Sequence, residues 1–390
     1  MSLNRKLRMA LIGGGPGAFI GDVHSKAARM DGKIELVAGV FSRDPAKSLA
    51  AGRSYFVNPD RVYGSYEELV EKEKQLPEGE RVDFIAITTP NHLHFPIAKE
   101  CLKAGFHVMC EKPMTYTVKE AKALRELVRR SGLVFGLMHN YTGYPMVKLA
   151  RDIIRQGDLG QLRKIVVQYP QGWLTDPQEK SGSKQAVWRT DPAQSGAAGA
   201  VGDIGTHAEN LCEYLTGLKI MEVCAEINTF VKGRRLDDDA NCLVHFEQGV
   251  KGLLHVSQIA NGEENDIAIW IFGSTKGLEW HQEQPNYLYI KDYKGPVQVW
   301  RRGNPYIGEK SPAAGRASRL PFGHPEGFIE AFANVYVNFG DTLSARLANE
   351  KPDPLMLDFP TVHDGLQGML FIETVLDSAR SKKKWTKMHS

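Results

Sequence analysis

The stretch LRMALIGGGPGAF, from Leu7 to Phe19, decides the fold of the first part of the chain. An apolar run of strand length ends in glycines, and a helix-like segment follows at once. Gly13, Gly15 and Ala18 fit G-x-G-x-x-A, in which the first glycine allows a tight turn and the second lets a pyrophosphate approach the backbone. Alanine at the third position still permits close packing of helix and strand. The predicted dinucleotide contacts of this loop are Gly13, Gly15, Pro16, Gly17 and Ala18.

Strand-like and helix-like segments alternate from this loop to about residue 140. VDFIAITT (82–89) is typical of a buried strand, and TVKEAKALRELVRRSG (117–132) of a helix with threonine at its start and glycine at its end. Such alternation indicates a parallel sheet with helices on both faces. It predicts a Rossmann-type, doubly wound α/β domain over residues 1–142.

The pattern changes after about residue 145. Extended runs joined by short turns, such as NCLVHFEQGVKGLLHVSQ (241–258), predict an α+β domain over 143–390 with a large, open, mostly antiparallel sheet. Residues 283–325 are rich in proline, glycine and arginine and are predicted as loop. Two helices are predicted near 326–339 and 361–381, and the last is expected to pack back on the first domain.

The overall composition is that of an ordinary soluble protein, with 42% hydrophobic and 24% charged residues and a net charge of +3. No long basic block and no membrane-length apolar run occurs, so neither nucleic acid nor a membrane is an expected partner. The five cysteines form no C-x-x-C pair, which argues against a thiolate zinc site and favours a reduced, cytoplasmic location. No metal is expected.

The end of the second predicted strand bears on the choice of cofactor. NAD-dependent proteins often place an acidic residue there for the ribose 2′-hydroxyl, but this chain has Ser42 followed by Arg43. A hydroxyl and a guanidinium suit a 2′-phosphate, which favours NADP over NAD. Asp44 lies one position further and leaves NAD open.

Three later strands end in polar residues at the same predicted sheet edge, where ligands bind. The predicted cofactor contacts there are Thr89, Pro90, Asn91, His94, Glu111, Lys112 and Asn140. Packing is an equal alternative for His94, and the His92–His94 pair lacks a third metal ligand. Lys112 follows a buried strand in the sequence EKP, where a partly desolvated ammonium can stabilise an alkoxide or share a proton.

The segment GAAGAVGDIGTHAENL (196–211) holds a carboxylate and an imidazole four residues apart, Asp203 and His207. In the first turn of an α-helix these side chains would lie on one side, and His207 could act as a general base. A helix cap and a core histidine form the alternative. Aromatic and charged residues that could bind a sugar are Tyr141, Trp173, Trp188, Arg189 and His324.

The glycine loop, TPNHLH (89–94), EKP (111–113), HNY (139–141) and DIGTH (203–207) together resemble the Gfo/Idh/MocA oxidoreductases over essentially the whole chain. WRTDP (188–192) and GHPEGFIEAFANVY (323–336) are similar to one branch of that family. The resemblance implies Lys112, Asp203 and His207 as the catalytic set. It also implies a homodimer or homotetramer formed through the outer face of the C-terminal sheet.

These observations predict an NAD(P)-dependent dehydrogenase that moves a hydride between the nicotinamide and a secondary hydroxyl or ketone of a sugar, polyol or cyclitol. A non-catalytic, dinucleotide-dependent sugar sensor on the same fold is the alternative. A third hypothesis is an enzyme of different chemistry that retains its dinucleotide through purification.

Overall fold

The computed structural model describes residues 3–390, and these form two compact units. The first comprises the chain up to Asn140 together with Phe328–Leu366. The second comprises Tyr141–Gly327 and Gln367–Ser390. A single domain boundary between residues 142 and 143 stays a prediction, as does the packing of the last helix on the first domain. Residues 1 and 2 of that predicted domain lie outside the described chain.

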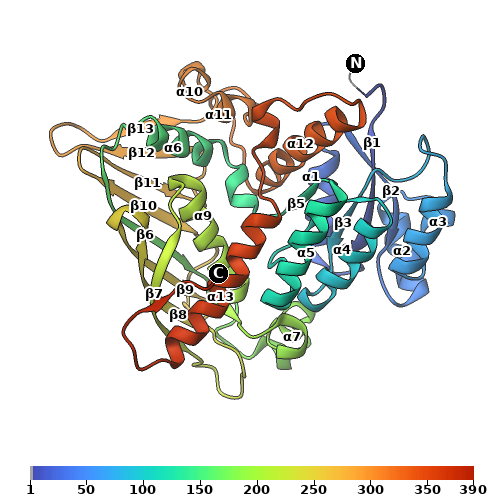
Figure 1. The fold of residues 1–390 in the computed structure, drawn as a ribbon, viewed down its shortest axis with the longest axis horizontal. Coiled ribbons are helices and arrows are strands. Elements are labelled where there is room, and N and C mark those ends of the chain that lie inside the picture. The colour runs from blue at the N-terminus through green and yellow to red at the C-terminus, as the bar shows by residue number, and fades with distance from the viewer. Residues whose placement is uncertain (1–2) are drawn as a thin grey trace. The chain divides into compact units, whose positions relative to one another are not determined.

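The first unit contains a five-stranded, all-parallel sheet with the strand order β2-β1-β3-β4-β5. Figure 1 shows helices on both sides of it, which confirms the predicted Rossmann-type fold. The strands are β1 (Leu7–Gly13), β2 (Ile34–Val40), β3 (Phe84–Thr88), β4 (His107–Cys110) and β5 (Phe135–Leu137). The helices are α1 (Phe19–Arg29), α2 (Pro45–Ser54), α3 (Tyr66–Gln75), α4 (His94–Lys103), α5 (Val118–Ser131) and α12 (Phe328–Leu347).

Helix α12 comes from the far end of the sequence and packs against α1 and one face of this sheet. Phe84 of β3 contacts Phe339 and Tyr336 of α12, with ring centroids 5.1 and 6.3 Å apart. Met9 and Leu11 of β1 join the same core because alternate side chains of a strand point to one face. This shared core holds α12 in the first unit.

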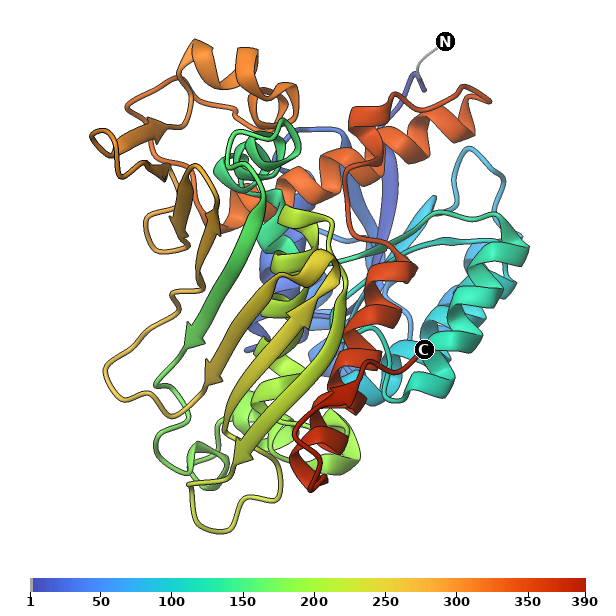
Figure 2. The ribbon, with the colours of Figure 1, turned by 60° about the vertical axis from the view of Figure 1, so that its left-hand side comes forward.

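The second unit is built on a nine-stranded sheet with the order β13-β12-β11-β10-β6-β9-β8-β7-β14 (Figure 2). Strands β6 and β9 pair in parallel and the other neighbouring pairs are antiparallel, so the predicted mostly antiparallel sheet is confirmed. The strands are β6 (Leu162–Pro170), β7 (Ile220–Asn228), β8 (Asp239–Phe246), β9 (Lys251–Ser257), β10 (Ala268–Gly273), β11 (Gly277–His281), β12 (Tyr287–Lys291), β13 (Gln298–Arg301) and β14 (Thr386–Lys387).

The helical segments of the second unit include α6 and α9, which both contact the nine-stranded sheet. They are α6 (Pro145–Arg155), α7 (Lys184–Arg189), α8 (Pro192–Ser195), a π-helical turn (Val201–Gly205), α9 (Thr206–Thr216), α10 (Pro305–Lys310) and α11 (Pro312–Arg316). Helix α13 (Val362–Arg380) contributes residues to both units. Within residues 3–390, no helix has the length and apolar character needed to cross a bilayer.

The prediction of loop for residues 283–325 was wrong in part. Strands β12 and β13 lie in this segment and pair from Tyr287↔Arg301 to Ile290↔Gln298, and α10 and α11 follow them. Both strands are short, and β12 is held in the sheet by its pairing with β11. A strand stabilised by its neighbours in the sheet is hard to recognise from its local composition.

Candidate functional site

The glycine loop brings backbone close to the ends of two neighbouring strands. A Cβ built on Gly13 would lie 2.6 Å from Thr88 Oγ1, and one on Gly15 would lie 2.5 Å from the carbonyl oxygen of Phe41. Gly13 also has a φ of +104°, which glycine adopts readily. Ala18, the N-cap of helix α1, provides no side-chain cap, so the first-turn N–H groups of the helix are donors for an anion.

Gly21 of helix α1 also packs against this loop. A Cβ on Gly21 would lie 2.2 Å from Gly14 Cα, so helix and loop pack backbone to backbone there. The close helix–strand packing expected at Ala18, the third position of the motif, is a different contact and stays a prediction.

Ser42, Arg43 and Asp44 follow β2 at the same sheet edge. Asp44 is the N-cap of α2, and the hydrogen bond that its Oδ1 accepts from Lys47 N, at 3.2 Å, lowers its pKa. Ser42 Oγ accepts a hydrogen bond from Asp44 N, and Arg43 is exposed. The carboxylate already serves the helix, whereas the guanidinium is available to a ligand.

Three buried polar atoms at this edge have no hydrogen-bond partner within the described chain. They are Thr89 Oγ1 and His92 Nδ1, after β3, and Asn140 Nδ2, after β5. Buried polar groups are normally paired, so these atoms fit a ligand with polar groups of its own. The sheet reverses its strand order between β1 and β3, which is where open α/β sheets bind ligands. The loop and these unpaired atoms together fit a dinucleotide.

His94 joins the loops that follow β3 and β4. Its Nδ1 and Nε2 each lie 2.8 Å from a carbonyl oxygen, that of Pro113 and that of Thr89. The ring is buried, and burial lowers its pKa. Pro90 and Asn91 lie between Thr89 and His94 in the sequence, and a short 3₁₀ turn (Asn91–Leu93) begins there. The imidazole therefore fixes the position of the loop that carries the predicted cofactor contacts.

Lys112 has an anionic and an uncharged neighbour. Burial raises the pKa of Glu111, but the hydrogen bond and the charge interaction with His24, together with the charge of Lys112, outweigh this effect and lower the pKa overall. Burial, together with the charge of Lys112, lowers the pKa of His139 to about 3. Lys112 therefore stands beside a carboxylate and a neutral imidazole.

In the second unit, Asp203 lies in the π-helical turn that runs directly into α9, and His207 is the second residue of α9. Both residues were predicted in the opening turn of one α-helix. This detail was wrong, because hydrogen bonds in a π-turn span i→i+5 and change the angular spacing of side chains. Such turns occur frequently at functional sites.

The π-helical turn is anchored by the buried carboxylate of Asp237, which the sequence analysis missed. Asp237 accepts hydrogen bonds from Gly199 N at 2.6 Å and Val201 N at 2.8 Å. Burial raises its pKa. A Cβ on Gly199 would lie 2.1 Å from the carbonyl oxygen of Asp237, so the glycine is needed for this approach. Asp237 thus fixes the start of the segment that carries Asp203.

The carboxylate of Asp203 receives two side-chain donors. Arg189 Nε and Gln258 Nε2 lie 3.2 and 2.9 Å from its Oδ2. The Arg189 guanidinium lies 4.2 Å from the ring centroid of Trp188 and 5.9 Å from that of Trp173. The structure therefore gathers four of the predicted residues, namely Trp173, Trp188, Arg189 and Asp203.

The imidazole of His207 is buried and packs against two tyrosines. The rings of Tyr141 and Tyr169 lie 4.8 and 6.4 Å from it, both edge to face. The two hydroxyls hydrogen-bond to each other, and Tyr169 donates to Asn265 Oδ1 at 2.8 Å. Burial raises the pKa of both tyrosines, that of Tyr141 to about 12. Tyr141 therefore supports the His207 ring, and its hydroxyl is engaged with Tyr169.

Several polar residues near Asp203 and His207 belong to no recognisable sequence motif. Gln171 Nε2 donates to Asn265 Oδ1 at 2.6 Å, and Gln171 Oε1 accepts from Trp173 Nε1 at 3.1 Å. The alternation of Tyr169 and Gln171 at the end of β6 was the one available hint. His324 is exposed, and its Nδ1 lies 3.2 Å from the carbonyl oxygen of Phe322. Its role in binding substrate stays a prediction.

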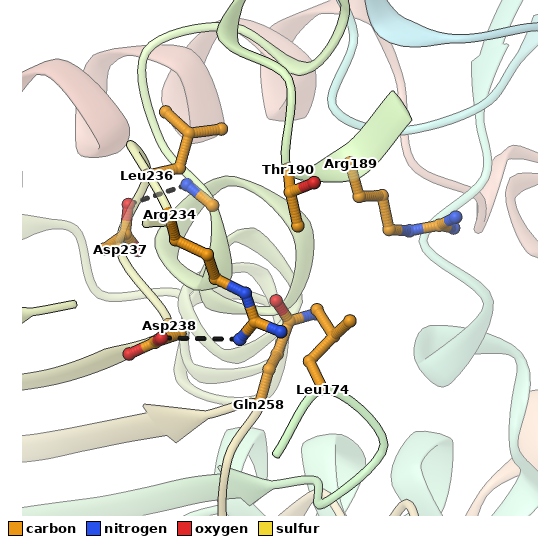
Figure 3. Close-up of a pocket in the computed structure, with 9 residues that line it drawn as sticks. Leu174, Arg189, Thr190, Arg234, Leu236, Asp237, Asp238 and Gln258 are labelled. Carbon is orange, nitrogen blue, oxygen red and sulfur yellow. Dashed lines mark hydrogen bonds and ion pairs between the residues drawn. The ribbon is translucent and has the colours of Figure 1, made fainter. Parts of the chain in front are cut away.

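A small pocket lies beside the partners of Asp203. Figure 3 shows Arg189 and Gln258 among its lining residues, with the Arg234 side chain extending toward Asp238. Arg234 is buried and forms ion pairs with Glu179 and Asp238, at 3.2 and 3.4 Å. The charge of Arg234 is thus already neutralised within the protein.

Comparison with known sequences identifies the two halves of the chain separately. Residues 7–139 match the family described as "Oxidoreductase family, NAD-binding Rossmann fold". Residues 147–279 match the "GFO/IDH/MocA C-terminal domain". Lys112 lies in the first match, and Asp203 and His207 lie in the second. That these three side chains converge stays a prediction.

Three relatives share most of the chain. The uncharacterized oxidoreductase YfiI of Bacillus subtilis is 32% identical over 98% of this chain and 97% of its own. An inositol dehydrogenase homolog of Azotobacter vinelandii, solved with NAD+, has a TM-score of 0.93 and 34% identity, covering 99% of this chain and 98% of its own. It has also been solved with NADH and myo-inositol (TM-score 0.90, 33% identity, the same coverage). Levoglucosan dehydrogenase of Pseudarthrobacter phenanthrenivorans is 27% identical over 73% of this chain and 76% of its own.

The low pKa of His139 predicts a loss of stability in acid. Its pKa of about 3 in the folded state compares with about 6.5 in an unfolded chain. Between these values the unfolded state binds more protons, so the free energy of unfolding falls as the pH falls. Replacement by phenylalanine removes this titration. His139→Phe should therefore lose about 2 kcal/mol less stability than the wild type between pH 6.5 and pH 5.

Urea unfolding at both pH values measures the difference. The control is His363→Phe, because His363 is exposed on α13 and should keep the wild-type pH dependence. Equal pH dependence in His139→Phe and the wild type would contradict the assignment.

Proposed function

The chain belongs to the Gfo/Idh/MocA family of oxidoreductases, and on that premise we propose that it is an NAD(P)-dependent dehydrogenase of small polyhydroxylated compounds. The substrate is a sugar, polyol or cyclitol that reacts at a secondary hydroxyl or ketone carbon. The inositol dehydrogenase homolog and levoglucosan dehydrogenase support this class, since one is named for a cyclitol and the other for an anhydrosugar.

The observation that carries the proposal is the glycine loop at the strand-order reversal of the first sheet. Its backbone has no room for side chains at Gly13 and Gly15, and the helix behind it presents N–H donors. Thr89 Oγ1 and Asn140 Nδ2 offer unpaired polar atoms at the same edge. The bound nicotinamide supplies the hydride acceptor or donor.

The proposed proton transfer belongs to His207. Imidazole titrates near physiological pH and commonly serves as a general base. The rings of Tyr141 and Tyr169 hold it in one orientation. During oxidation His207 takes the hydroxyl proton while the carbon loses its hydride to the nicotinamide, and a carbonyl group forms. The reverse reaction uses the same groups.

Lys112 and Asp203 complete the proposed catalytic set. The ammonium of Lys112 stabilises the alkoxide oxygen that develops as the proton leaves. Asp203 orients the imidazole of His207 or accepts a hydrogen bond from a neighbouring substrate hydroxyl. The donors Arg189 and Gln258 fix the direction of its carboxylate.

Trp173, Trp188 and Arg189 form the proposed wall of the sugar site. The guanidinium, 4.2 and 5.9 Å from the ring centroids of Trp188 and Trp173, and the indole rings together present apolar faces and polar edges. Such surfaces suit the alternating C–H and O–H groups of a sugar ring. Tyr141 contributes through the position of His207, and His324 is the remaining proposed substrate contact.

The proposed oligomer is a homodimer or homotetramer that uses the exposed face of the nine-stranded sheet. Helices α6 and α9 contact this sheet, and residues in register across the strands put an apolar row on the other side. Leu243 and Val299, both 46% exposed, belong to that row. Exposed apolar patches of this kind commonly mark protein interfaces. The row consists of Leu243, Leu253, Val166, Trp270, Tyr289 and Val299, with the charged Glu279 of β11 between Trp270 and Tyr289.

The first prediction from this function concerns the catalytic groups. Lys112→Ala and His207→Ala should each lower kcat/KM at least about 100-fold, because each removes a group that acts on the reacting oxygen or its proton. Absorbance of the reduced nicotinamide is followed with a panel of inositols, sugars and anhydrosugars, with NAD+ and with NADP+. Lys119→Ala and His363→Ala, which change exposed residues, should keep wild-type rates.

Two results of this experiment would contradict the proposal. Turnover that survives both active-site substitutions would overturn the roles of Lys112 and His207. Tight dinucleotide and sugar binding without turnover of any compound would identify a sensor instead of an enzyme.

The second prediction concerns the cofactor. Because Arg43 is exposed after β2 and Asp44 is used as a helix cap, Arg43→Ala should raise KM for NADP+ about tenfold and change KM for NAD+ less than about twofold. Steady-state kinetics with each cofactor test this. An equal effect on both cofactors, or a wild-type protein that does not use NADP+, would exclude a 2′-phosphate contact.

The third prediction concerns assembly. Leu243→Glu places a charge in the apolar row and should convert the oligomer to a smaller species. Size-exclusion chromatography with light scattering gives the mass, and Lys119→Glu on α5 is the control. A monomeric wild type, or a variant of unchanged mass, would contradict the proposed interface.

A further inference from the structure

A chain of buried hydrogen bonds runs from helix α12 to the backbone of Lys112. Tyr336 Oη lies 2.6 Å from His24 Nδ1, and His24 Nε2 lies 2.7 Å from Glu111 Oε1. Lys112 N then donates to Glu111 Oε2 at 3.1 Å. Tyr336, His24 and Glu111 are only 1%, 0% and 6% exposed, so little water competes for these bonds. We call this series of groups the His24 relay.

One arrangement of protons satisfies every member of the His24 relay. Burial raises the pKa of Tyr336 well above its ordinary range, so the hydroxyl keeps its proton and donates to His24 Nδ1. The low pKa of Glu111 makes its carboxylate an acceptor on both oxygens. His24 therefore carries a proton on Nε2 and donates it to Glu111. Each group thus donates to the next, from the Tyr336 hydroxyl through His24 to the Glu111 carboxylate.

Packing holds the imidazole of His24 in this orientation. Its ring lies edge to face with Phe332 at 5.4 Å and with Tyr336 at 5.6 Å. Tyr336 in turn packs on Phe84 of β3. His24 belongs to α1, which follows the glycine loop. The relay thus connects the glycine-loop helix and α12 to the main chain at Lys112.

We propose that His24 and Tyr336 are positioning residues for Lys112, acting through the two carboxylate oxygens of Glu111. The relay fixes the backbone of Lys112. It therefore limits the positions that the ammonium group of this side chain can occupy. Burying a carboxylate is costly, and an apolar core of similar volume would stabilise the fold as well or better. The inference rests on the catalytic role proposed for Lys112.

Tyr336→Phe is the sharpest variant, because it keeps the ring and removes only the hydroxyl that donates to His24. The expected result is a kcat about tenfold lower, with KM for both substrates changed less than about twofold. A second readout needs no turnover. In protein labelled with [15N]lysine, the amide resonance of Lys112, assigned by its absence in Lys112→Arg, should shift.

His107→Phe is the matched control. His107 opens β4, whereas Glu111 follows the other end of the same strand. Its Nδ1 accepts a hydrogen bond from Val134 N at 2.8 Å, so the control also loses a hydrogen bond of a largely buried histidine. It should lower stability without changing kcat or the Lys112 amide resonance. An equal loss of kcat in both variants would overturn the proposal.

The double variant tests whether the effect passes through Glu111. Tyr336 and Glu111 are joined by His24, so Tyr336→Phe should add little to the loss of kcat in Glu111→Gln. Fully additive losses would show that the two residues act independently and would overturn the relay.

The proposed function and this inference fail in different ways. A protein that turns over no compound refutes the dehydrogenase, and the amide resonance then still tests the relay. An unshifted Lys112 resonance in Tyr336→Phe overturns the relay, even if the dehydrogenase is confirmed.

Discussion

The first unit depends on close contacts of the glycine loop that leave no room for a Cβ atom. A Cβ on Gly13 would lie 2.6 Å from Thr88 Oγ1, one on Gly15 would lie 2.5 Å from the carbonyl oxygen of Phe41, and one on Gly21 would lie 2.2 Å from Gly14 Cα. The ends of β1, β2 and β3 and the start of α1 therefore meet within a few ångströms. Because glycine alone fits there, the loop presents N–H groups directly to a phosphate.

Two buried carboxylates show how the surroundings decide the state of an acid. Asp237 receives backbone N–H groups at the start of the π-helical turn, yet burial dominates and its pKa rises. Glu111 is equally removed from water, but it has an imidazole and an ammonium as neighbours, and its pKa falls. The first anchors the backbone near Asp203, and the second anchors the backbone at Lys112. Near Asp203 and at Lys112, a buried acid that is not itself proposed to react thus fixes the backbone that carries a proposed catalytic residue.

The sequence predicts those features whose causes are local. The alternation of apolar runs predicted the parallel sheet, and Thr117 and Gly132 predicted the ends of α5, where a capping box and a φ of +67° occur. It could not predict contacts that need distant partners. Tyr169, Asn265 and Gln258 meet at the candidate site only because β6, β9 and the segment before β10 are neighbours in the sheet. The π-helical turn was likewise not predicted, and Asp237, whose carboxyl group accepts hydrogen bonds at its start, is distant in the sequence.

The π-helical turn gives this site an unusual way to change. An α-helix advances about 100° per residue, and a π-turn contains one residue more than an α-helical turn of the same span. Deletion of a single residue from Val201–Gly205 would restore regular winding and swing the Asp203 carboxylate around the helix axis, while α9 and the tyrosines around His207 kept their places. One codon lost or gained here could redirect a carboxylate toward a different hydroxyl without disturbing the core, a route to new substrates within an unchanged scaffold.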